Sequence, residues 1–413
     1  MIQNEIAGGV SGKVVQAGSV RQIVFAADKV DFPVPSQLPP LPRHFTSRSR
    51  ELAALDEWAQ DSRDRLMLAV VSGTAGVGKT MLALHWLHRA RERFPGGQLY
   101  VDLGAFSPGG PVKPEDVLEW FLLALGLPAT RIPEGLPQRV ALYRSMTARR
   151  EMSVLLDNAL SAAQVRALLP SSPDCVVVVT SRHRLSGLRV NGARFLDLAP
   201  LDLEDSVALL DNVIGDRRAE NEHAEAEELA RLCGGLPIAL SVVGARLSAR
   251  PHRTLGREVA AIRDKDRLMA LDMGEDVSVS DIFDMSYESL PADAALLYRL
   301  CSLHPGPEFG LDVAAAITGM SVAGTEDAAD ALVERSLLTE VADRRYRHHD
   351  LLSLHARQLA GRMDDEVSRL ACTRRMVEWY LDRTAAADVT LRPTRRRVGT
   401  RFRNGPLAFR PCR

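Results

Sequence analysis

The sequence predicts an α/β protein whose first half forms a parallel sheet and whose second half is mainly helical. Between residues 66 and 198, apolar runs typical of buried strands alternate with helix-forming segments. This alternation indicates parallel strands joined by crossover helices. A glycine-rich loop follows the first apolar run, and beyond Pro200 only short strand-like pieces recur. These observations favour an α/β domain followed by smaller helical domains.

Length and composition indicate a globular chain of several domains. Its 413 residues are enough for about two to four domains. The 52 Lys and Arg residues nearly cancel the 53 Asp and Glu residues, so net charge gives no argument for nucleic-acid or membrane binding. No apolar run has the length of a membrane span, and five scattered cysteines indicate a reducing compartment. We therefore expect a cytoplasmic protein without a membrane partner.

The residues before the sheet are expected to form a leader and a linker. Residues 1–30 are rich in glycine, and Val14 to Phe25 has the pattern of a β-hairpin. A disordered leader is an equally good interpretation, because an isolated hairpin is only marginally stable. Five prolines between Asp31 and Pro42 predict a stiff, extended linker.

The glycine-rich loop carries the strongest functional signal. It has the pattern Gly73-x4-Gly78-Lys79-Thr80 and lies between a buried strand and a helix, which is the arrangement of a phosphate-binding loop. The glycines permit a tight turn, so that successive N–H groups face an anion at a helix N-terminus. We expect Lys79 to reach the outer phosphates and Thr80 to ligate Mg²⁺. The candidate nucleotide contacts here are Gly73, Thr74, Ala75, Gly76, Val77, Gly78, Lys79, Thr80 and Met81.

The remaining elements define the expected domains. Further strands are expected at residues 98–103, 152–157, 175–180 and 193–198, followed by helices at 203–214, 224–233 and 237–249. Helices between 281 and 362, with strand-like pieces at 338–341 and 345–349, form a winged-helix pattern. The expected domains are the leader and linker (1–44), an α/β nucleotide-binding domain (45–200), a helical domain (201–275), a winged-helix domain (276–362) and the helical start of a C-terminal module with a basic tail (363–413).

Asp157 and Asn158 are candidates for the chemistry of hydrolysis. Asp157 ends the third predicted strand, which is where phosphate-loop NTPases place the aspartate that holds Mg²⁺. The alternative is a strand-terminal aspartate that caps the next helix. Asn158 follows, and an amide cannot accept a proton from water at neutral pH. We therefore predict slow hydrolysis, suited to a timer.

Three further residues are candidates with weaker local signals. Arg182 follows the fourth strand at the carboxyl edge of the sheet, where its planar fork suits a γ-phosphate, although a solvated surface arginine is the alternative. Pro237 starts a helix after Gly234-Gly235, and helix-end geometry alone explains that placement. His349, at the end of the second wing strand, has no distinctive pattern in isolation.

Taken in order, these motifs resemble the NB-ARC class of STAND NTPases, the nucleotide switches of apoptosome scaffolds, plant resistance proteins and bacterial regulators. The resemblance covers about residues 38–359. Leu303 to Gly310 looks most like the central part of actinobacterial regulators of the antibiotic-regulatory (SARP-type) group. The matching segments are residues 45–48, 73–80, 155–158, 180–182, 198–201, 235–240 and 348–350.

The resemblance implies a P-loop NTPase sheet of the AAA+/NB-ARC type, followed by a helical and a winged-helix domain. ADP would be buried between the domains at rest. By matching position, Phe45, Thr46 and Arg48 would lie near the adenine, Pro237 would contact the base or sugar, and His349 would bond the β-phosphate. Exchange for ATP would swing the winged-helix domain away and expose surfaces for self-association. ATP or ADP and Mg²⁺ are the implied cofactors, and an effector or sensor protein is the implied partner.

The sequence departs from the family pattern in three respects. Ser47 stands where many relatives have Gly, and His348 stands where Met is common. No sensor repeats or effector domain are recognisable, and the arginine-rich residues 392–413 stand where a repeat array would begin. A truncated or frame-altered member is therefore the working hypothesis.

Two alternative functions compete with a switch. The winged helix and the SARP-type kinship suggest a DNA-binding transcriptional regulator. The helix before the wing, Glu326 to Ser336, carries four acidic residues and only one arginine, which disfavours direct DNA binding through it. The basic wing and tail leave weak nonspecific binding open. A remodelling ATPase ring is disfavoured by Asn158 and by the lack of a recognisable pore loop.

Overall fold

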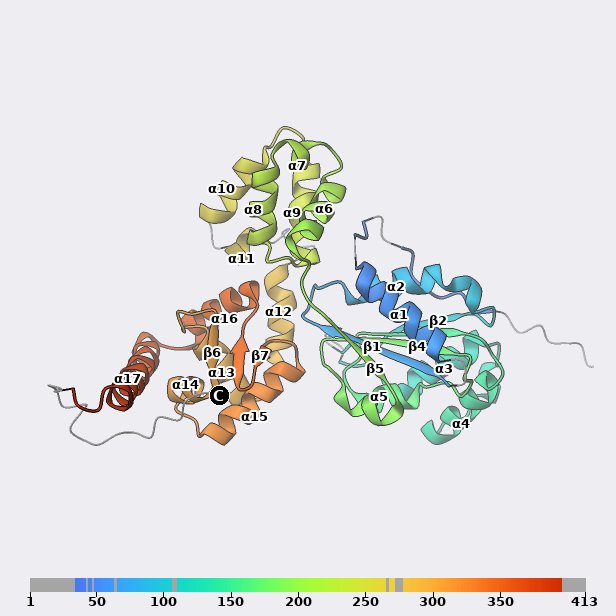
Figure 1. Ribbon diagram of the computed structural model, residues 1–413. Coiled ribbons are helices and arrows are strands. Elements are labelled where there is room, and N and C mark those ends of the chain that lie inside the picture. Colours follow the sequence, from blue (N-terminus) through green and yellow to red (C-terminus); the bar gives the residue numbers. More distant parts are fainter. Residues whose placement is uncertain are drawn as a thin grey trace, which may run out of the picture. The chain divides into compact units, whose positions relative to one another are not determined.

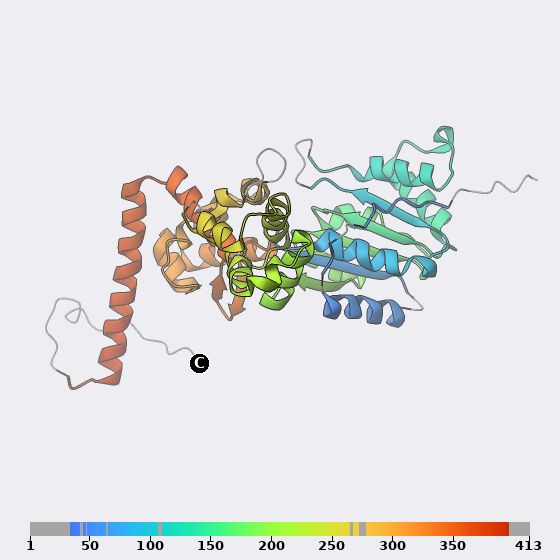
Figure 2. The same ribbon diagram turned by 90° about the horizontal axis from the view of Figure 1, so that it is seen from above.

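The computed structural model describes residues 34–41, 44–46, 48–62, 65–105, 110–264, 267–271 and 278–395. The expected hairpin between Val14 and Phe25, Ser47 and the tail beyond Arg395 lie outside these residues. Figures 1 and 2 show the elements in two views.

Five parallel strands form the sheet, which confirms the predicted α/β fold. Their order is β2-β3-β4-β1-β5, so β4 separates β1 from β3. The carboxyl ends of parallel strands meet at one edge. The loop after β1 and the last residue of β3 therefore flank the end of β4. The strands are β1 (Met67–Gly73), β2 (Gln98–Asp102), β3 (Ser153–Asp157), β4 (Val176–Ser181) and β5 (Arg194–Leu198).

Both faces of the sheet are covered by helices. Alternate residues of β1 point to opposite faces. Ala69 and Val71 pack in one core with α1 and α2, whereas Leu68 and Val70 pack in the other with α3 and α4 (Figure 1). This explains why the strands read as continuous apolar runs. The helices are α1 (Ser49–Asp61), α2 (Lys79–Arg89), α3 (Pro114–Ala124), α4 (Leu136–Thr147) and α5 (Ala162–Ala167), with 3₁₀ turns η1 (Arg91–Arg93), η2 (Ala129–Arg131) and η3 (Ser186–Asn191).

The proline-rich segment before α1 covers the β2 edge of the sheet. Ser36 forms a parallel bridge with Gln98, and the Gln98 N–H donates to the carbonyl of Pro35 at 2.7 Å. Gly97 permits this approach, because a Cβ there would lie 2.6 Å from the Pro35 carbonyl oxygen. The sequence predicts only an extended linker. The structure adds that the segment satisfies polar groups of an edge strand that would otherwise be unpaired.

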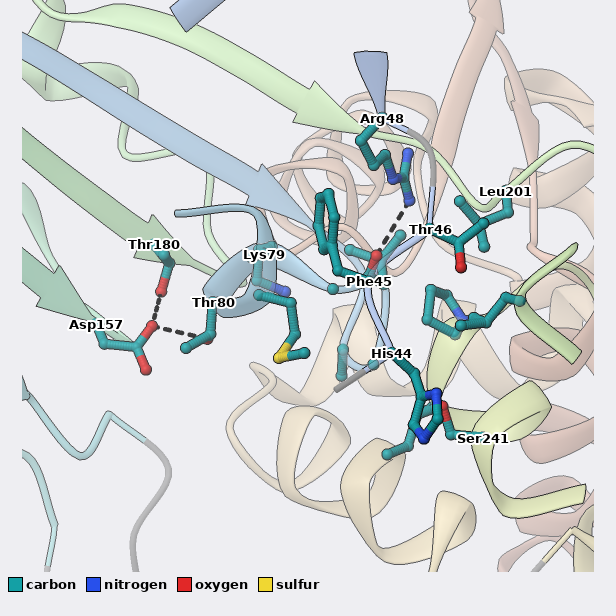
Figure 3. A pocket seen from close by; sticks show the side chains of 18 of the residues that line it. His44, Phe45, Thr46, Arg48, Lys79, Thr80, Asp157, Thr180, Leu201 and Ser241 are labelled. Atoms are coloured by element: carbon teal, nitrogen blue, oxygen red, sulfur yellow. Dashed lines mark hydrogen bonds between the residues drawn. The ribbon is translucent and has the colours of Figure 1, made fainter. Parts of the chain in front are cut away.

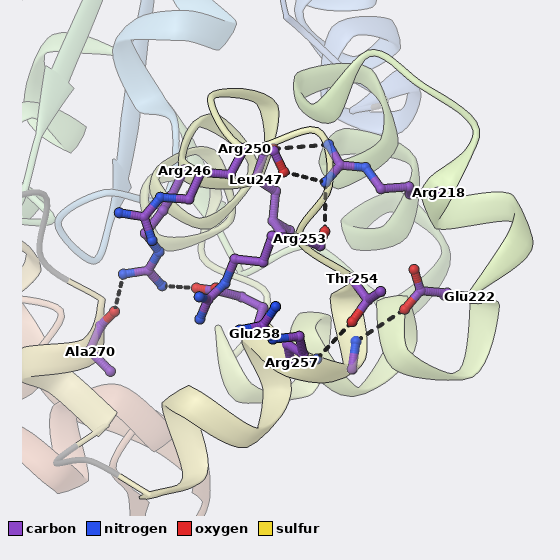
Figure 4. A network of polar contacts seen from close by, with 11 residues as sticks. Arg218, Glu222, Arg246, Leu247, Arg250, Arg253, Thr254, Arg257, Glu258 and Ala270 are labelled. Carbon is purple, nitrogen blue, oxygen red and sulfur yellow. Dashed lines mark hydrogen bonds and ion pairs between the residues drawn. The ribbon is translucent and has the colours of Figure 1, made fainter.

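Six helices follow the sheet, and a buried carboxylate ties three of them together (Figure 4). Glu258 is 1% exposed and pairs with Arg246 and Arg253, while Arg246 Nη1 donates to the carbonyl of Ala270 at 2.7 Å. The network therefore joins α9, α10 and α11. The six helices are α6 (Leu203–Ile214), α7 (Arg218–Asn221), α8 (His223–Leu232), α9 (Pro237–Ser248), α10 (Leu255–Asp264) and α11 (Arg267–Ala270).

The next region contains helices and a small antiparallel sheet of order β6-β8-β7. These are components that a winged helix requires, and the assignment to that fold stays a prediction. Figure 2 shows α17 as one uninterrupted helix. The helices are α12 (Val279–Glu288), α13 (Ala292–Cys301), α14 (Leu311–Thr318), α15 (Val322–Glu334), α16 (Asp350–Met363) and α17 (Glu366–Leu391), and the strands are β6 (Glu308–Gly310), β7 (Thr339–Ala342) and β8 (Arg345–Arg347).

Candidate functional site

A cavity of about 450 Å³ lies at the carboxyl edge of the sheet (Figure 3). Its volume falls within the range of small-molecule sites. One part, here named the loop end, is formed by the glycine-rich loop, Asp157, Asn158, Thr180 and Arg182. The opposite part, here named the apolar end, is formed by Phe45, Leu201, Leu209, Pro237 and Ile238. The other lining residues are His44, Thr46, Arg48, Met81, Asp102 and Ser241.

The glycine-rich loop has the backbone that its sequence predicts. Gly76 and Gly78 have φ values of 78° and 96°, a region that disfavours side-chain-bearing residues. The helix α2 begins at Lys79, so its unpaired N–H groups lie beside the cavity. Lys79 Nζ donates to the carbonyls of Gly73 at 2.8 Å and Thr74 at 2.9 Å. Burial and the nearby Arg182 lower the pKa of Lys79 to about 7.

The structure brings the two predicted magnesium ligands together. Thr80 Oγ1 donates to Asp157 Oδ1 at 2.8 Å, and the Thr180 hydroxyl donates to the same oxygen. Asp157 is 6% exposed, and burial raises its pKa although both hydroxyl hydrogen bonds oppose that shift. Within the described ranges, no group of three His, Cys, Asp or Glu side chains is placed to hold a metal. Mg²⁺ prefers one or two protein oxygens together with phosphate and water, which this pair fits.

Thr180 has a role that the sequence did not reveal. Its hydroxyl donates to Asp157 and accepts the N–H of Asn158 at 3.0 Å. Asn158 has a φ of 55°, so its backbone is held in a conformation that is uncommon outside glycine. A polar residue at or next to the carboxyl end of the strand beside the aspartate strand is the sequence signal that identifies such a position.

Arg182 connects the loop end to α12. Its Nη1 donates to the carbonyl of Ile282 at 3.0 Å and to Ser286 Oγ at 2.7 Å. Burial lowers the pKa of Arg182 to about 10. Arg182 therefore lies in the cavity wall and bridges to a helix 100 residues further along the chain.

At the apolar end, residues from distant segments meet. The ring of Phe45 stacks on His85 with a centroid distance of 4.1 Å. Thr46 Oγ1 accepts a hydrogen bond from Asn212 Nδ2 at 3.0 Å, and Arg48 Nη2 donates to the Val77 carbonyl at 3.1 Å. The sequence identified Phe45, Thr46, Arg48 and Pro237. It did not single out His44, Leu209 and Ser241, which lie in no motif, or Leu201 and Ile238, which lie in matching segments but were not named as contacts.

Three predicted contacts lie outside the cavity lining. Gly73 ends β1 against the carbonyl of Leu198, and Thr74 Oγ1 donates to the carbonyl of Ser336 at 3.2 Å. His349 lines a neighbouring cavity that shares Leu201, and its Nε2 lies 2.8 Å from the Gly234 carbonyl oxygen. The expected place of His349 at the end of a wing strand is wrong, because β8 ends at Arg347 and His349 is the N-cap of α16. Its contact with a β-phosphate stays a prediction.

Comparisons with known proteins agree with this architecture. No family model matches the chain. Over 374 residues it is 39% identical to the regulatory protein AfsR of Streptomyces coelicolor, covering 88% of this chain and 37% of that protein. It is 38% identical over 364 residues to AfsR of Streptomyces griseus, covering 88% and 37%, respectively. It is 23% identical over 355 residues to apoptotic protease-activating factor 1 of Danio rerio, covering 83% and 28%.

These relatives include a bacterial regulatory protein and an apoptotic protease-activating factor. The similarities agree with the resemblance to the NB-ARC class of STAND NTPases that the motifs carry. Among solved structures, the Walker-type ATPase PABY2304 of Pyrococcus abyssi superposes with a TM-score of 0.50 at 17% identity, covering 76% of this chain and 95% of that one. This likeness supports the fold. The chain spans little more than a third of the length of the AfsR proteins that it matches.

The basic residues of the small sheet are engaged within the protein. Arg345 and Arg347 both pair with Glu308, and Arg344 lies 3.8 Å from Asp312. The carboxyl end of α15 also contacts the α/β region, because the Arg184 N–H donates to the Glu334 carbonyl at 2.9 Å. No described helix is long and apolar enough to cross a membrane.

Proposed function

We propose that the chain is a signal-transduction switch that holds ADP at rest, and that it opens or self-associates when ATP replaces ADP. It acts in the cytoplasm, where its activity is coupled to an effector or sensor protein. The regulatory role is supported by the similarity to AfsR, which is a regulatory protein. The proposal is specific about ADP, ATP and Mg²⁺, which the loop end fits in residue type and arrangement.

The observation that carries the proposal is that one cavity joins the glycine-rich loop to the start of α9. The Ile238 N–H donates to the Gly76 carbonyl at 3.2 Å, and Pro237, Ile238 and Ser241 line the same cavity as Lys79. A nucleotide held by the loop would therefore contact both the sheet region and the helical region that follows it. Its binding energy would stabilise their closed arrangement.

The residues of the loop end have complementary roles in this proposal. The loop N–H groups and Lys79 bind the phosphates, and Thr80 and Asp157 would hold Mg²⁺, which neutralises charge between the outer phosphates. Asn158 orients water by hydrogen bonding but does not accept its proton at neutral pH. The bound nucleotide is therefore hydrolysed slowly, and each state persists long enough to signal.

Through Arg182, the nucleotide would influence the contact between the sheet region and α12. The guanidinium of Arg182 donates to Ile282 and Ser286 of α12. A third phosphate at the loop end would compete for the same donors, because phosphate is a stronger acceptor than a carbonyl or hydroxyl. ATP would thereby weaken the contact with α12. His349, next to Gly234, is the proposed contact of the β-phosphate in the ADP state.

The nucleotide content of the freshly purified protein tests the proposal. Heat extraction and chromatography should release a stoichiometric amount of ADP, and Lys79→Ala should lose it. A protein that is empty, and that hydrolyses added ATP many times per second, would overturn the switch and favour a working ATPase.

DNA binding through the α15 region is a second function that the observations do not favour. Its carboxyl end contacts Arg184, and nearby arginines are paired with acidic groups. A gel-shift assay with random duplex DNA at low salt tests this alternative. Binding that Arg344→Ala and Arg345→Ala abolish would establish it.

A further inference from the structure

The side chain of Arg48 contacts the glycine-rich loop itself. It is 8% exposed, and its Nη2 donates to the carbonyl of Val77, in the middle of the loop, at 3.1 Å (Figure 3). Its Nη1 donates to Glu51 Oε1 at 2.9 Å. The guanidinium is therefore anchored in α1 on one side and bonded to the loop on the other.

A carbonyl held from outside fixes the direction of the next N–H. The Val77 carbonyl and the Gly78 N–H belong to one peptide plane, and in a trans peptide they point in opposite directions. The described residues contain no cis peptide bond. When Arg48 holds the Val77 oxygen, the Gly78 N–H is turned the other way. Glycine makes such control necessary, because Gly78 has few steric barriers to rotation.

The neighbouring peptide of the loop is held in the same manner from a different element. The Gly76 carbonyl accepts the Ile238 N–H at 3.2 Å, which fixes the peptide between Gly76 and Val77. Lys79 Nζ holds the carbonyls of Gly73 and Thr74. Several hydrogen bonds therefore hold carbonyl groups of the loop in place. The bond from Arg48 comes from the N-cap of α1.

We infer that Arg48 is a positioning residue for the diphosphate of the nucleotide, and that it acts through the Val77–Gly78 peptide. This inference rests on the proposed nucleotide binding and deepens it. It differs from a contact between Arg48 and the adenine, which the family resemblance implies. The two roles predict different losses of affinity for ADP and for AMP. A base contact acts equally on every adenine nucleotide, whereas a loop brace acts more strongly on ADP than on AMP, because the loop N–H groups cradle the α- and β-phosphates together and AMP has no β-phosphate.

Competition for a fluorescent ADP analogue, with ADP and AMP as competitors, separates the two roles. For Arg48→Met we expect the affinity for ADP to fall about tenfold or more and the affinity for AMP to change less than about threefold. Arg48→Lys keeps one cationic donor, so its ADP loss should be intermediate and its AMP affinity again unchanged. If Arg48→Met does not fold, the ADP and AMP affinities of Arg48→Lys distinguish the loop brace from the base contact.

Arg139→Met is the matched control. Arg139 is also largely buried and donates to two carbonyls, those of Pro133 and Glu115, but it lies outside the cavity lining. Its loss should leave both affinities unchanged. Equal losses of ADP and AMP in the Arg48 variants, or no loss in either, would overturn the inference. A wild-type protein that binds neither nucleotide would instead refute the proposed function.

Discussion

At its loop end the cavity is built largely from the consecutive residues 75–81, whereas its apolar end is assembled from residues 44–48 and from α6 and α9 far along the chain. The loop end is positioned by one strand, one helix and their neighbours in a single sheet. The apolar end exists only when separate helical packing brings Leu201, Leu209 and Pro237 to the sheet. From this difference we expect phosphate binding to depend on the local structure of the sheet, and any contact with a base to depend on long-range folding.

The largest effect is expected at the loop end. Lys79→Ala removes the only loop cation and should weaken ADP binding about 100-fold or more, because charge-assisted hydrogen bonds to phosphate are strong. Isothermal titration calorimetry measures the change. Lys113→Ala, at an exposed position before α3, is the control and should bind ADP as the wild type does. Equal affinities of wild type and Lys79→Ala would contradict a local phosphate site.

The folding of the helical region should depend on Glu258. Glu258→Ala leaves Arg246 and Arg253 without their buried carboxylate and should lower the free energy of unfolding by about 3 kcal/mol. Thermal unfolding, followed with and without ADP, measures this change in the free energy of unfolding. Glu228→Ala, which removes a more exposed partner of Arg263, should lower it by less than about 1 kcal/mol. Similar losses in both variants would show that the buried network is not what holds α9 to α11.

The region that carries His349 should respond to acid through its neighbour His348. Burial lowers the pKa of His348 to about 4, and it is 7% exposed. The unfolded chain binds a proton near pH 6.5, whereas the folded chain does not until about pH 4, so stability is lost as pH falls between these values. Between pH 7 and pH 5 the loss should be about 2 kcal/mol.

Denaturant unfolding at the two pH values measures this loss. In His348→Met the corresponding part of the pH dependence should disappear, because Met does not titrate. An unchanged pH dependence in that variant would assign the acid sensitivity to other groups.

The smallest effect is expected at the apolar end. Asn212→Ala removes an exposed hydrogen bond to Thr46 and should weaken ADP binding about two- to threefold. Asn191→Ala removes a comparable exposed bond to Arg166, away from the cavity, and should leave ADP affinity unchanged. A loss as large as that of Lys79→Ala would overturn the contrast between the two ends.

The sequence by itself determined the features whose physical causes are local. Five strands lie close to their expected positions, because buried parallel strands require continuous apolar runs. The glycine-rich loop and Asp157 were identified because residue type and spacing along one strand–loop–helix unit fix their geometry. The proximity of Thr80 and Asp157, the predicted magnesium ligands, followed from placing both at one edge of the sheet.

The tertiary structure alone decided the features that depend on contacts between distant segments. The order of the strands places Thr180 next to Asp157. Arg48, which the family resemblance places near an adenine, forms a hydrogen bond to the Val77 carbonyl. The tertiary structure also paired the proline-rich segment with β2 and placed His349 at a neighbouring cavity. Each of these polar groups has several possible hydrogen-bonding partners. Which partner lies within hydrogen-bonding distance depends on how elements far apart in the chain pack together.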